Sequence, residues 1–275
     1  MRKNKLLNKI NVHQLSMDLS TFRDLELMLN ALYAVWLREF KVFLRESSRL
    51  IASIFTPLLW LFVVGSGLGS AAPSVGEDYQ KFIFPGIISM SVIFSSVFFG
   101  SYIIWDRKFD FLKSVMVAPV SRETIFVGKT LGGMTTSLVQ VSILLLVGGP
   151  IGIQFDAFTV SQIVATVLLL SFALTSLGLA MGSFIESLEG FQLIVSFVVF
   201  PLFFLSGALF PLQNLPEWLS ILTTINPVTY AVDALRNAMM LSSKHTFGID
   251  IVILFLSTVA LSLLGTLSFR KMKAV

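Results

Sequence analysis

The chain has 275 residues, of which 55% are hydrophobic and 13% are charged, whereas about a quarter of the residues in a soluble domain are charged. This composition excludes an ordinary soluble domain, and apolar runs recur at roughly the twenty-residue length that crosses about 30 Å of hydrocarbon. The pI of 9.4 would indicate nucleic-acid binding in a soluble protein. Here we attribute it to basic residues on one side of a membrane and expect no nucleic-acid partner. Cysteine is absent, which excludes disulfides and thiolate chemistry.

The first 24 residues are polar and basic and have no apolar core of a cleavable signal, so we expect a cytoplasmic arm. Residues 25–49 then show apolar side chains at spacings of three and four: Leu25, Leu29, Leu32, Val35, Trp36, Phe40, Phe43 and Leu44. The remaining surface is largely basic, with Arg38, Lys41, Arg45 and Arg49. This pattern is typical of an amphipathic helix in the membrane interface. The alternative is a solvated helix that packs on a partner domain.

Six apolar segments of spanning length follow, and we expect one all-α polytopic membrane domain over residues 25–275. The expected spans are about 50–69, 82–105, 124–147, 160–185, 191–210 and 249–269. Seventeen of the 20 lysines and arginines lie before the first span, in residues 107–129 or after the last span. The other three are Lys81, Arg236 and Lys244. The positive-inside rule therefore predicts a cytoplasmic (plasma or inner) membrane protein with both termini in the cytoplasm.

Residues 200–240 begin as an apolar run but are broken by glycine and prolines: Pro201, Gly207, Pro211, Pro216 and Pro227. Irregular backbone at membrane depth is tolerated only where protein buries it or where it lines a cavity. We therefore expect residues 207–240 to dip into the outer half of the membrane and to return as short amphipathic helices.

Two features of the second short helix are predicted from local spacing. Asn226 and Pro227 should end one short helix and begin the next. Asp233 and Arg236 lie three residues apart and can form a local ion pair, which needs no ligand to explain it.

The sequence offers little for catalysis, and we expect neither an enzyme nor a bound cofactor or metal. Its two histidines, His13 and His245, have no partner carboxylate at a ligand-like spacing. The tripeptide Gly128-Lys129-Thr130 resembles part of a phosphate-binding loop, but position 123 is Glu where that motif needs its first glycine. Any ATP must therefore bind to another chain.

Small and polar residues inside the expected spans indicate how the helices pack. Gly128 with Gly132, and Gly178 with Gly182, have the GxxxG spacing that lets helix backbones approach closely. Such contacts could lie inside one bundle or at a dimer seam. Gln140, in the middle of a span, should face protein, and an interhelical hydrogen bond is favoured over contact with a substrate.

We identify no ionisable residue within the membrane. Ion-coupled carriers normally need a titratable group near the midplane. This absence counts against a self-contained carrier and favours a pathway that is powered from outside the chain.

Between the second and third spans, residues 106–122 read as a short amphipathic cytoplasmic helix that stops near Pro119. Its apolar face would hold Phe109, Leu112, Val115 and Met116, with Lys108, Asp110 and Lys113 outside that face. Such a segment could lie passively in the interface or could be contacted by a soluble partner.

Three passages together resemble a known family: LREFKVFLRESSRLIASIFTPLLWLFVVG, WDRKFDFLKSVMVAPVSRETIFVGKTLGG and SGALFPLQNLPEWLSILTTINPVTYAVDALR. The chain is similar, from about residue 30 to its end, to membrane subunits of ABC exporters of the ABC-2 (type V) class. It is most similar to the bacterial daunorubicin-resistance and nodulation-type permeases. In the second passage, relatives usually carry an acidic residue and a glycine where this chain has Lys108 and Asp110.

The resemblance implies that two six-span subunits pair and that each rests on a separate ATP-binding subunit, which holds the ATP and Mg²⁺. The helix over 25–49 and a coupling helix over 106–122 would contact that subunit. The residues expected to couple are Arg38, Arg45, Arg107, Lys108, Phe109, Leu112, Lys113, Ala118, Pro119 and Arg122. The residues expected in the re-entrant outer gate are Gly207, Phe210, Pro211, Pro216, Trp218, Asn226, Pro227, Tyr230, Asp233 and Arg236.

The resemblance also implies export of a hydrophobic small molecule or lipid-like cargo by alternating access. A polysaccharide or glycolipid exporter is the main alternative. A channel or secondary carrier, and a membrane scaffold without transport, are weaker alternatives.

Overall fold

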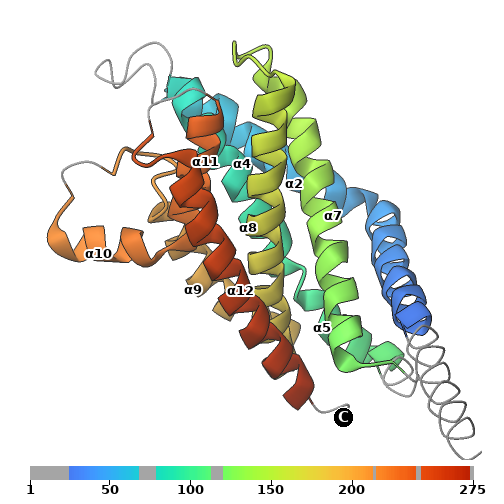
Figure 1. Cartoon of the computed structure of the whole chain (residues 1–275). Helices are drawn as coiled ribbons and strands as arrows, with labels where there is room; N and C mark the ends of the chain where they lie inside the picture. The colour runs from blue at the N-terminus through green and yellow to red at the C-terminus, as the bar shows by residue number, and fades with distance from the viewer. Residues whose placement is uncertain (1–24, 68–78, 113–119, 213–214, 240–242, 273–275) are drawn as a thin grey trace, which may run out of the picture.

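The computed structural model describes residues 25–67, 79–112, 120–212, 215–239 and 243–272. Within these ranges the chain forms helices joined by turns and short loops, and no strand (Figure 1). Residues 25–45 form the first helix. The elements that follow are α2 (Ser47–Leu59), the π-helical turn η1 (Trp60–Val64), α4 (Tyr79–Phe98), α5 (Ser101–Lys108), α7 (Arg122–Gly148), α8 (Ala157–Phe184), α9 (Leu188–Phe204), α10 (Glu217–Ile225), α11 (Pro227–Ala238) and α12 (Phe247–Lys271).

Five helical stretches of the described chain are long and apolar enough to cross a membrane. They are Leu50–Gly67, Tyr79–Lys108, Arg122–Gly148, Ala157–Phe184 and Phe247–Lys271. The fifth expected span, 191–210, is instead the shorter helix α9, which begins at Leu188 and ends at Phe204. It ends there because the chain turns over residues 205–207, where Gly207 takes a φ of 75° that side chains other than glycine rarely adopt.

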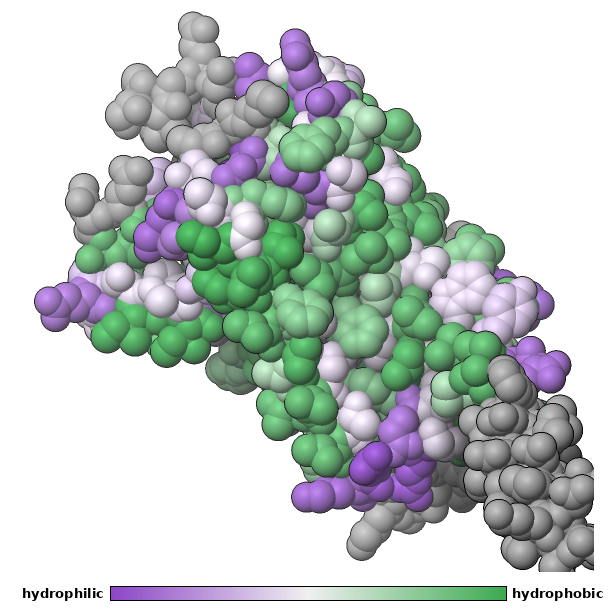
Figure 2. Space-filling view, viewed as in Figure 1, coloured by the Kyte–Doolittle hydropathy of each residue, from purple (hydrophilic) through white to green (hydrophobic). Residues whose placement is uncertain are grey.

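The spanning helices differ strongly in how much of each is covered by the rest of the chain. In Tyr79–Lys108, 78% of the most apolar window is buried, against 17% in Phe247–Lys271 and in Leu50–Gly67. Central helices α4 and α8 therefore build the core, while α2 and α12 leave large apolar side chains outside. Figure 2 shows the matching surface, with a hydrophobic middle and hydrophilic groups toward the two ends.

The two GxxxG pairs are both used inside the chain. A Cβ at Gly178 would meet the Val97 backbone, and one at Gly182 would meet the Gly100 backbone, so α8 lies directly against the turn between α4 and α5. Gly128 and Gly132 likewise face the helix over 25–45. Of the two alternatives for these spacings, packing within one bundle is the one observed.

Gln140 makes the interhelical hydrogen bonds that its position predicted. Its Nε2 donates to Ser53 Oγ on α2 at 3.0 Å, and Ser91 Oγ on α4 lies 3.5 Å from its Oε1. This buried amide thus joins α7 to two neighbouring helices.

The broken stretch after α9 forms two short helices that meet at Asn226. The side chain of Asn226 accepts a hydrogen bond from Val228 N at 3.0 Å and donates one to Leu202 O at 2.7 Å. It therefore caps α11 and attaches the α10–α11 corner to α9. Figure 1 shows α10 projecting sideways from the bundle, whereas α11 packs on α8 and α12.

Candidate functional site

The first candidate site is a cluster of four charged side chains, here called the charge cluster: Arg38, Glu39, Asp106 and Lys129. Lys129 Nζ lies 2.7 Å from Glu39 Oε1 and also pairs with Asp106. Arg38 Nη2 lies 2.5 Å from Asp106 Oδ1, and Arg38 Nη1 lies 2.7 Å from Glu39 Oε1. Glu39, Asp106 and Lys129 are each at most 4% exposed. Two acids and two bases cancel in formal charge, which is the condition under which ionised groups survive burial.

This cluster corrects two predictions. Lys129 lies inside the expected span 124–147 and is buried, so the prediction that no ionisable residue lies within the membrane is wrong. Asp106 was expected at the start of a cytoplasmic segment, but α5 continues through Lys108 and carries Asp106 into the core. The physical reason is that each charge finds its partners on a different helix, which no local pattern reveals.

A second feature is the end of the bundle formed by α5, the start of α7 and the last turns of α8 and α12, here called the α5 end. Arg107 donates from Nη2 to Gly182 O at 2.7 Å and to Ser183 O at 3.3 Å. A cation here satisfies the free carbonyls at the C-terminus of α8 and complements the dipole of that helix. Arg122 similarly donates to Arg270 O at 2.5 Å and to Met272 O at 3.0 Å.

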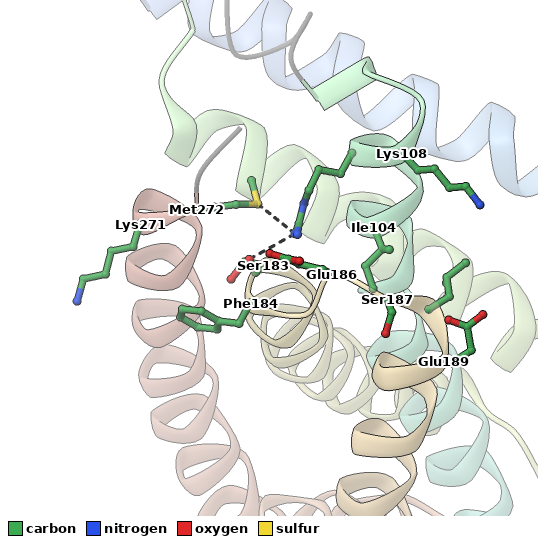
Figure 3. Close-up of a pocket in the computed structure, with 11 residues that line it drawn as sticks. Ile104, Lys108, Ser183, Phe184, Glu186, Ser187, Glu189, Lys271 and Met272 are labelled. Atoms are coloured by element: carbon green, nitrogen blue, oxygen red, sulfur yellow. Dashed lines mark hydrogen bonds between the residues drawn. The ribbon is translucent and has the colours of Figure 1, made fainter. Parts of the chain in front are cut away.

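The α5 end also holds a cavity of about 660 Å³ (Figure 3). Its walls come from α5, the α8–α9 turn and the end of α12, and its lining mixes both charges. Lys108 and Lys271 point away from each other toward its two sides, and Glu186 and Glu189 lie on the α8–α9 side. The cavity is therefore an open recess, lined by both charged and apolar side chains, between elements that are far apart in sequence.

Of the residues predicted to couple, Lys108 and Phe109 are accessible at this end. Phe109 is 70% exposed and stacks on Trp105, with ring centroids 5.6 Å apart. Lys108 Nζ lies 5.3 Å from the Trp105 ring. These side chains form an exposed aromatic and basic patch, here called the Phe109 patch: Trp105, Lys108 and Phe109. Arg45 is also exposed, but it lies at the end of the first helix, next to Glu46, which accepts a hydrogen bond from Tyr102 at the start of α5.

The other predicted coupling residues lie elsewhere. Arg38 belongs to the charge cluster, and Arg107 and Arg122 bind backbone carbonyls of their own chain. Leu112 is buried and Phe109 is exposed, so the predicted common apolar face of these two residues is wrong. Turn residues 109–110 separate them, and Asp110 takes a φ of 56°, in the left-handed region that favours glycine and tolerates Asp. Lys113, Val115, Met116, Ala118 and Pro119 lie outside the described residues.

The residues predicted for the outer gate lie near α11. Arg236 Nη2 donates to Gly207 O at 2.6 Å, and its guanidinium lies 4.2 Å from the Phe82 ring. Burial lowers the pKa of Arg236 to about 10. Local spacing predicted an ion pair between Asp233 and Arg236, and this prediction is wrong. Asp233 instead accepts hydrogen bonds from the backbone amides of Lys244 and His245. The correction follows from the return of the chain after α11, which brings those amides to Asp233.

The remaining gate residues divide into a buried and an exposed set. Tyr230 is buried, donates to Thr224 O at 2.8 Å and has its pKa raised by burial. Pro227 is the first residue of α11 and is half-buried. The exposed members are Phe210, Pro211, Pro216 and Trp218. Trp218 is 65% exposed on α10, together with Ile221, Leu222 and Ile225, so α10 presents an apolar surface outside the bundle.

Glu39 is the functional candidate that sequence reasoning missed. A signal for it exists, because Glu39 lies three residues after Trp36 and four before Phe43, on the buried face of the first helix. A carboxylate at such a position requires a buried cation, and Lys129 supplies it.

The long apolar helices, the hydrophobic middle surface and the polar ends define a polytopic, all-α membrane protein. A sequence model described as ABC-2 type transporter matches residues 30–240. The chain therefore belongs to the ABC-2 type transporter family. It is a transmembrane permease of an ABC transporter and a multi-pass protein of the inner membrane, and this family implies an ABC ATP-binding partner.

Several named relatives support this assignment. The putative transport permease ycf38 of Cyanophora paradoxa is 29% identical over 98% of this chain and 96% of its own. The inner membrane transport permease YadH of Escherichia coli (strain K12) is 29% identical over 81% of this chain and 89% of its own. Nodulation protein J of Neorhizobium galegae is 26% identical over 75% of this chain and 80% of its own.

Proposed function

We propose that this chain is the permease of an ATP-driven exporter and that two copies form the pathway for a hydrophobic small molecule or lipid-like cargo. A separate ATP-binding subunit binds the ATP and Mg²⁺ and contacts the Phe109 patch at the α5 end. The α5 end then faces the cytoplasm, and residues 207–240 form the outer gate. The motif SG-x-x-FP followed by LP-x-W, at residues 206–218, supports this choice of cargo by resemblance, because polysaccharide-exporting relatives usually lack it.

The observation that carries this proposal is the link from the Phe109 patch to the charge cluster. Phe109 directly follows α5, and Asp106 on α5 is ion-paired with Lys129 on α7 and with Arg38 on the first helix. A force applied to the patch therefore reaches two further helices through buried ion pairs, which are costly to break. This gives a physical route by which ATP-driven closure of the partner moves the bundle.

The exposed aromatic pair gives the partner a point of attachment. Trp105 and Phe109 are stacked and accessible, and tryptophan and phenylalanine are enriched at protein–protein interfaces. By contrast, Arg107 and Arg122 are already held by backbone carbonyls and serve to fix the shape of this end.

We expect Phe109→Ala to weaken binding of the ATP-binding subunit by at least about tenfold, because loss of a binding hot spot costs about 2 kcal/mol or more. Binding is measured by co-purification with an ABC ATP-binding subunit from the same genome, and coupling by ATP hydrolysis in nanodiscs. Phe158→Ala is the matched control, because Phe158 is 66% exposed at the opposite end of the bundle. Equal binding of the two variants would contradict the proposed docking site.

The cargo is tested with inside-out vesicles that contain both subunits. ATP-dependent uptake of a fluorescent lipophilic drug or a labelled lipid is the expected result. Uptake of a lipid-linked oligosaccharide alone would favour the polysaccharide or glycolipid alternative, and uptake driven by an ion gradient without nucleotide would contradict an ABC mechanism.

A further inference from the structure

Three side chains converge where α11 is joined to α12. Asp233 lies on α11, His245 lies in the connection, and Asp250 lies in the first turn of α12. His245 Nδ1 is 3.2 Å from Asp233 Oδ2 and 3.5 Å from Asp250 Oδ1. Potential ligand atoms of all three residues lie within 4.8 Å of one another. Sequence spacing indicated no ligand-like partner carboxylate for His245, but the structure brings two carboxylates to it, because the chain folds back between α11 and α12.

Asp250 is the member whose environment requires a partner. It is 0% exposed, and neither oxygen of its carboxylate has a hydrogen-bond partner. Burying an ionised carboxylate without compensation costs far more than burying a hydrogen-bonded polar group. Nδ1 of His245 also lacks a hydrogen bond. A cation between these groups would satisfy both the carboxylate and the imidazole nitrogen.

Asp233 is held in place for such a role. Its carboxylate accepts hydrogen bonds from Lys244 N at 2.8 and 3.0 Å and from His245 N at 2.7 Å. Hydrogen bonds of this kind orient a carboxylate that ligates a metal. Asp233 and His245, but not Asp250, also line a cavity of about 460 Å³, so an open space reaches two of the three side chains.

We propose that Asp233, His245 and Asp250 bind one divalent transition-metal cation of the Zn²⁺ type. One imidazole nitrogen with two carboxylates is a ligand set that Zn²⁺ accepts. Imidazole disfavours Mg²⁺ and Ca²⁺, which prefer oxygen ligands. The bound cation fastens α11 to α12 and so stabilises this end of the bundle. This site does not depend on the proposed transport function.

The experiment uses the full chain, purified in nanodiscs with a tag that contains no histidine and stripped of metal with a chelator. Isothermal titration with ZnCl₂ is expected to show one site per chain, and Zn²⁺ should raise the unfolding temperature. Asp250→Asn should weaken Zn²⁺ binding by at least about tenfold, since even loss of a group that only orients a ligand costs about 10–100-fold. Mg²⁺ and Ca²⁺, added as their chlorides, should bind more weakly than Zn²⁺.

Two matched controls should bind Zn²⁺ as the unsubstituted chain does. His13→Ala removes the only other histidine of the sequence, and Glu217→Gln removes an exposed carboxylate on α10. His245→Ala, at a half-buried position, provides a second test that does not depend on how Asp250→Asn folds, and it should lose binding as well.

Absence of stoichiometric Zn²⁺ binding would overturn the proposal, as would equal binding by His245→Ala and His13→Ala. A rise in unfolding temperature in Asp250→Asn, together with no effect of Zn²⁺ on the unsubstituted chain, would also overturn it. That result would mean that the buried carboxylate of Asp250 destabilises the chain and is not compensated by a cation.

Discussion

Lys129 is a buried cation that pairs with carboxylates from two other helices. It is 1% exposed and reaches Glu39 on the first helix and Asp106 on α5. Arg38 completes the cluster, with its guanidinium 3.6 Å from the Phe111 ring. The ammonium group therefore holds three helical segments together by charge-assisted hydrogen bonds in a region of low dielectric, where removal of one partner leaves an uncompensated charge.

We expect Lys129→Met to lower the free energy of unfolding by about 3–5 kcal/mol, the usual cost of breaking a buried ion pair from one side. The measurement is reversible unfolding in mixed micelles. Lys41→Met is the control, because Lys41 is exposed on the first helix. The combined exchange Glu39→Lys with Lys129→Glu should recover part of the loss. If Lys129→Met is as stable as the control, the cluster contributes no net stability.

At the scale of helices, close backbone contact decides how α8 meets the turn between α4 and α5. Gly178 and Gly182 lie against the backbone of Val97 and Gly100. Such approach brings many atoms into van der Waals contact, which drives association where lipid removes the hydrophobic difference between helix surfaces. It also places Arg107 where it can bind the carbonyls that end α8.

We expect Gly178→Ala to lower the free energy of unfolding by about 1–3 kcal/mol, the typical cost of overpacking a tight interface. A Cβ at this position meets backbone, which cannot rotate away as a flexible side chain can. Gly248→Ala in α12 is the matched control, because its Cβ meets nothing within 4 Å. The control should be neutral or slightly stabilising, since alanine favours helix. Equal loss in both variants would contradict the packing explanation.

At the scale of the whole molecule, the two ends of the bundle have different chemistry. The α5 end holds the Phe109 patch with Lys108, and Lys271 at the end of α12. The opposite end carries the Asp156 cap of α8 and the α11–α12 connection. This asymmetry is the basis for expecting the α5 end in the cytoplasm.

We expect Lys108→Cys and Lys271→Cys to react with a membrane-impermeant maleimide only in inside-out vesicles. Asp156→Cys and Glu217→Cys should react only in intact spheroplasts. All four positions are exposed, and the chain has no cysteine of its own, so each label reports one site. Reaction of Lys271→Cys and Glu217→Cys from the same side would overturn the proposed orientation.

Much of the helical framework could be predicted because its signals are local. Apolar length predicted six spans, of which five correspond to helical stretches long and apolar enough to cross a membrane. Gln140 was correctly expected to form a hydrogen bond between helices. The end of α9 at Phe204 was missed, because the apolar run continues past the turn at Gly207.

The sequence by itself determined an all-helical membrane protein with an irregular segment after α9, because hydrophobic length and proline or glycine breaks act within a few residues. Only the tertiary structure decided that Lys129 is neutralised by Glu39 and Asp106 and that Asp250 lies beside His245. It also decided that the GxxxG pairs face their own chain. These contacts join residues from separate segments, and their energies depend on burial that arises only when the helices pack.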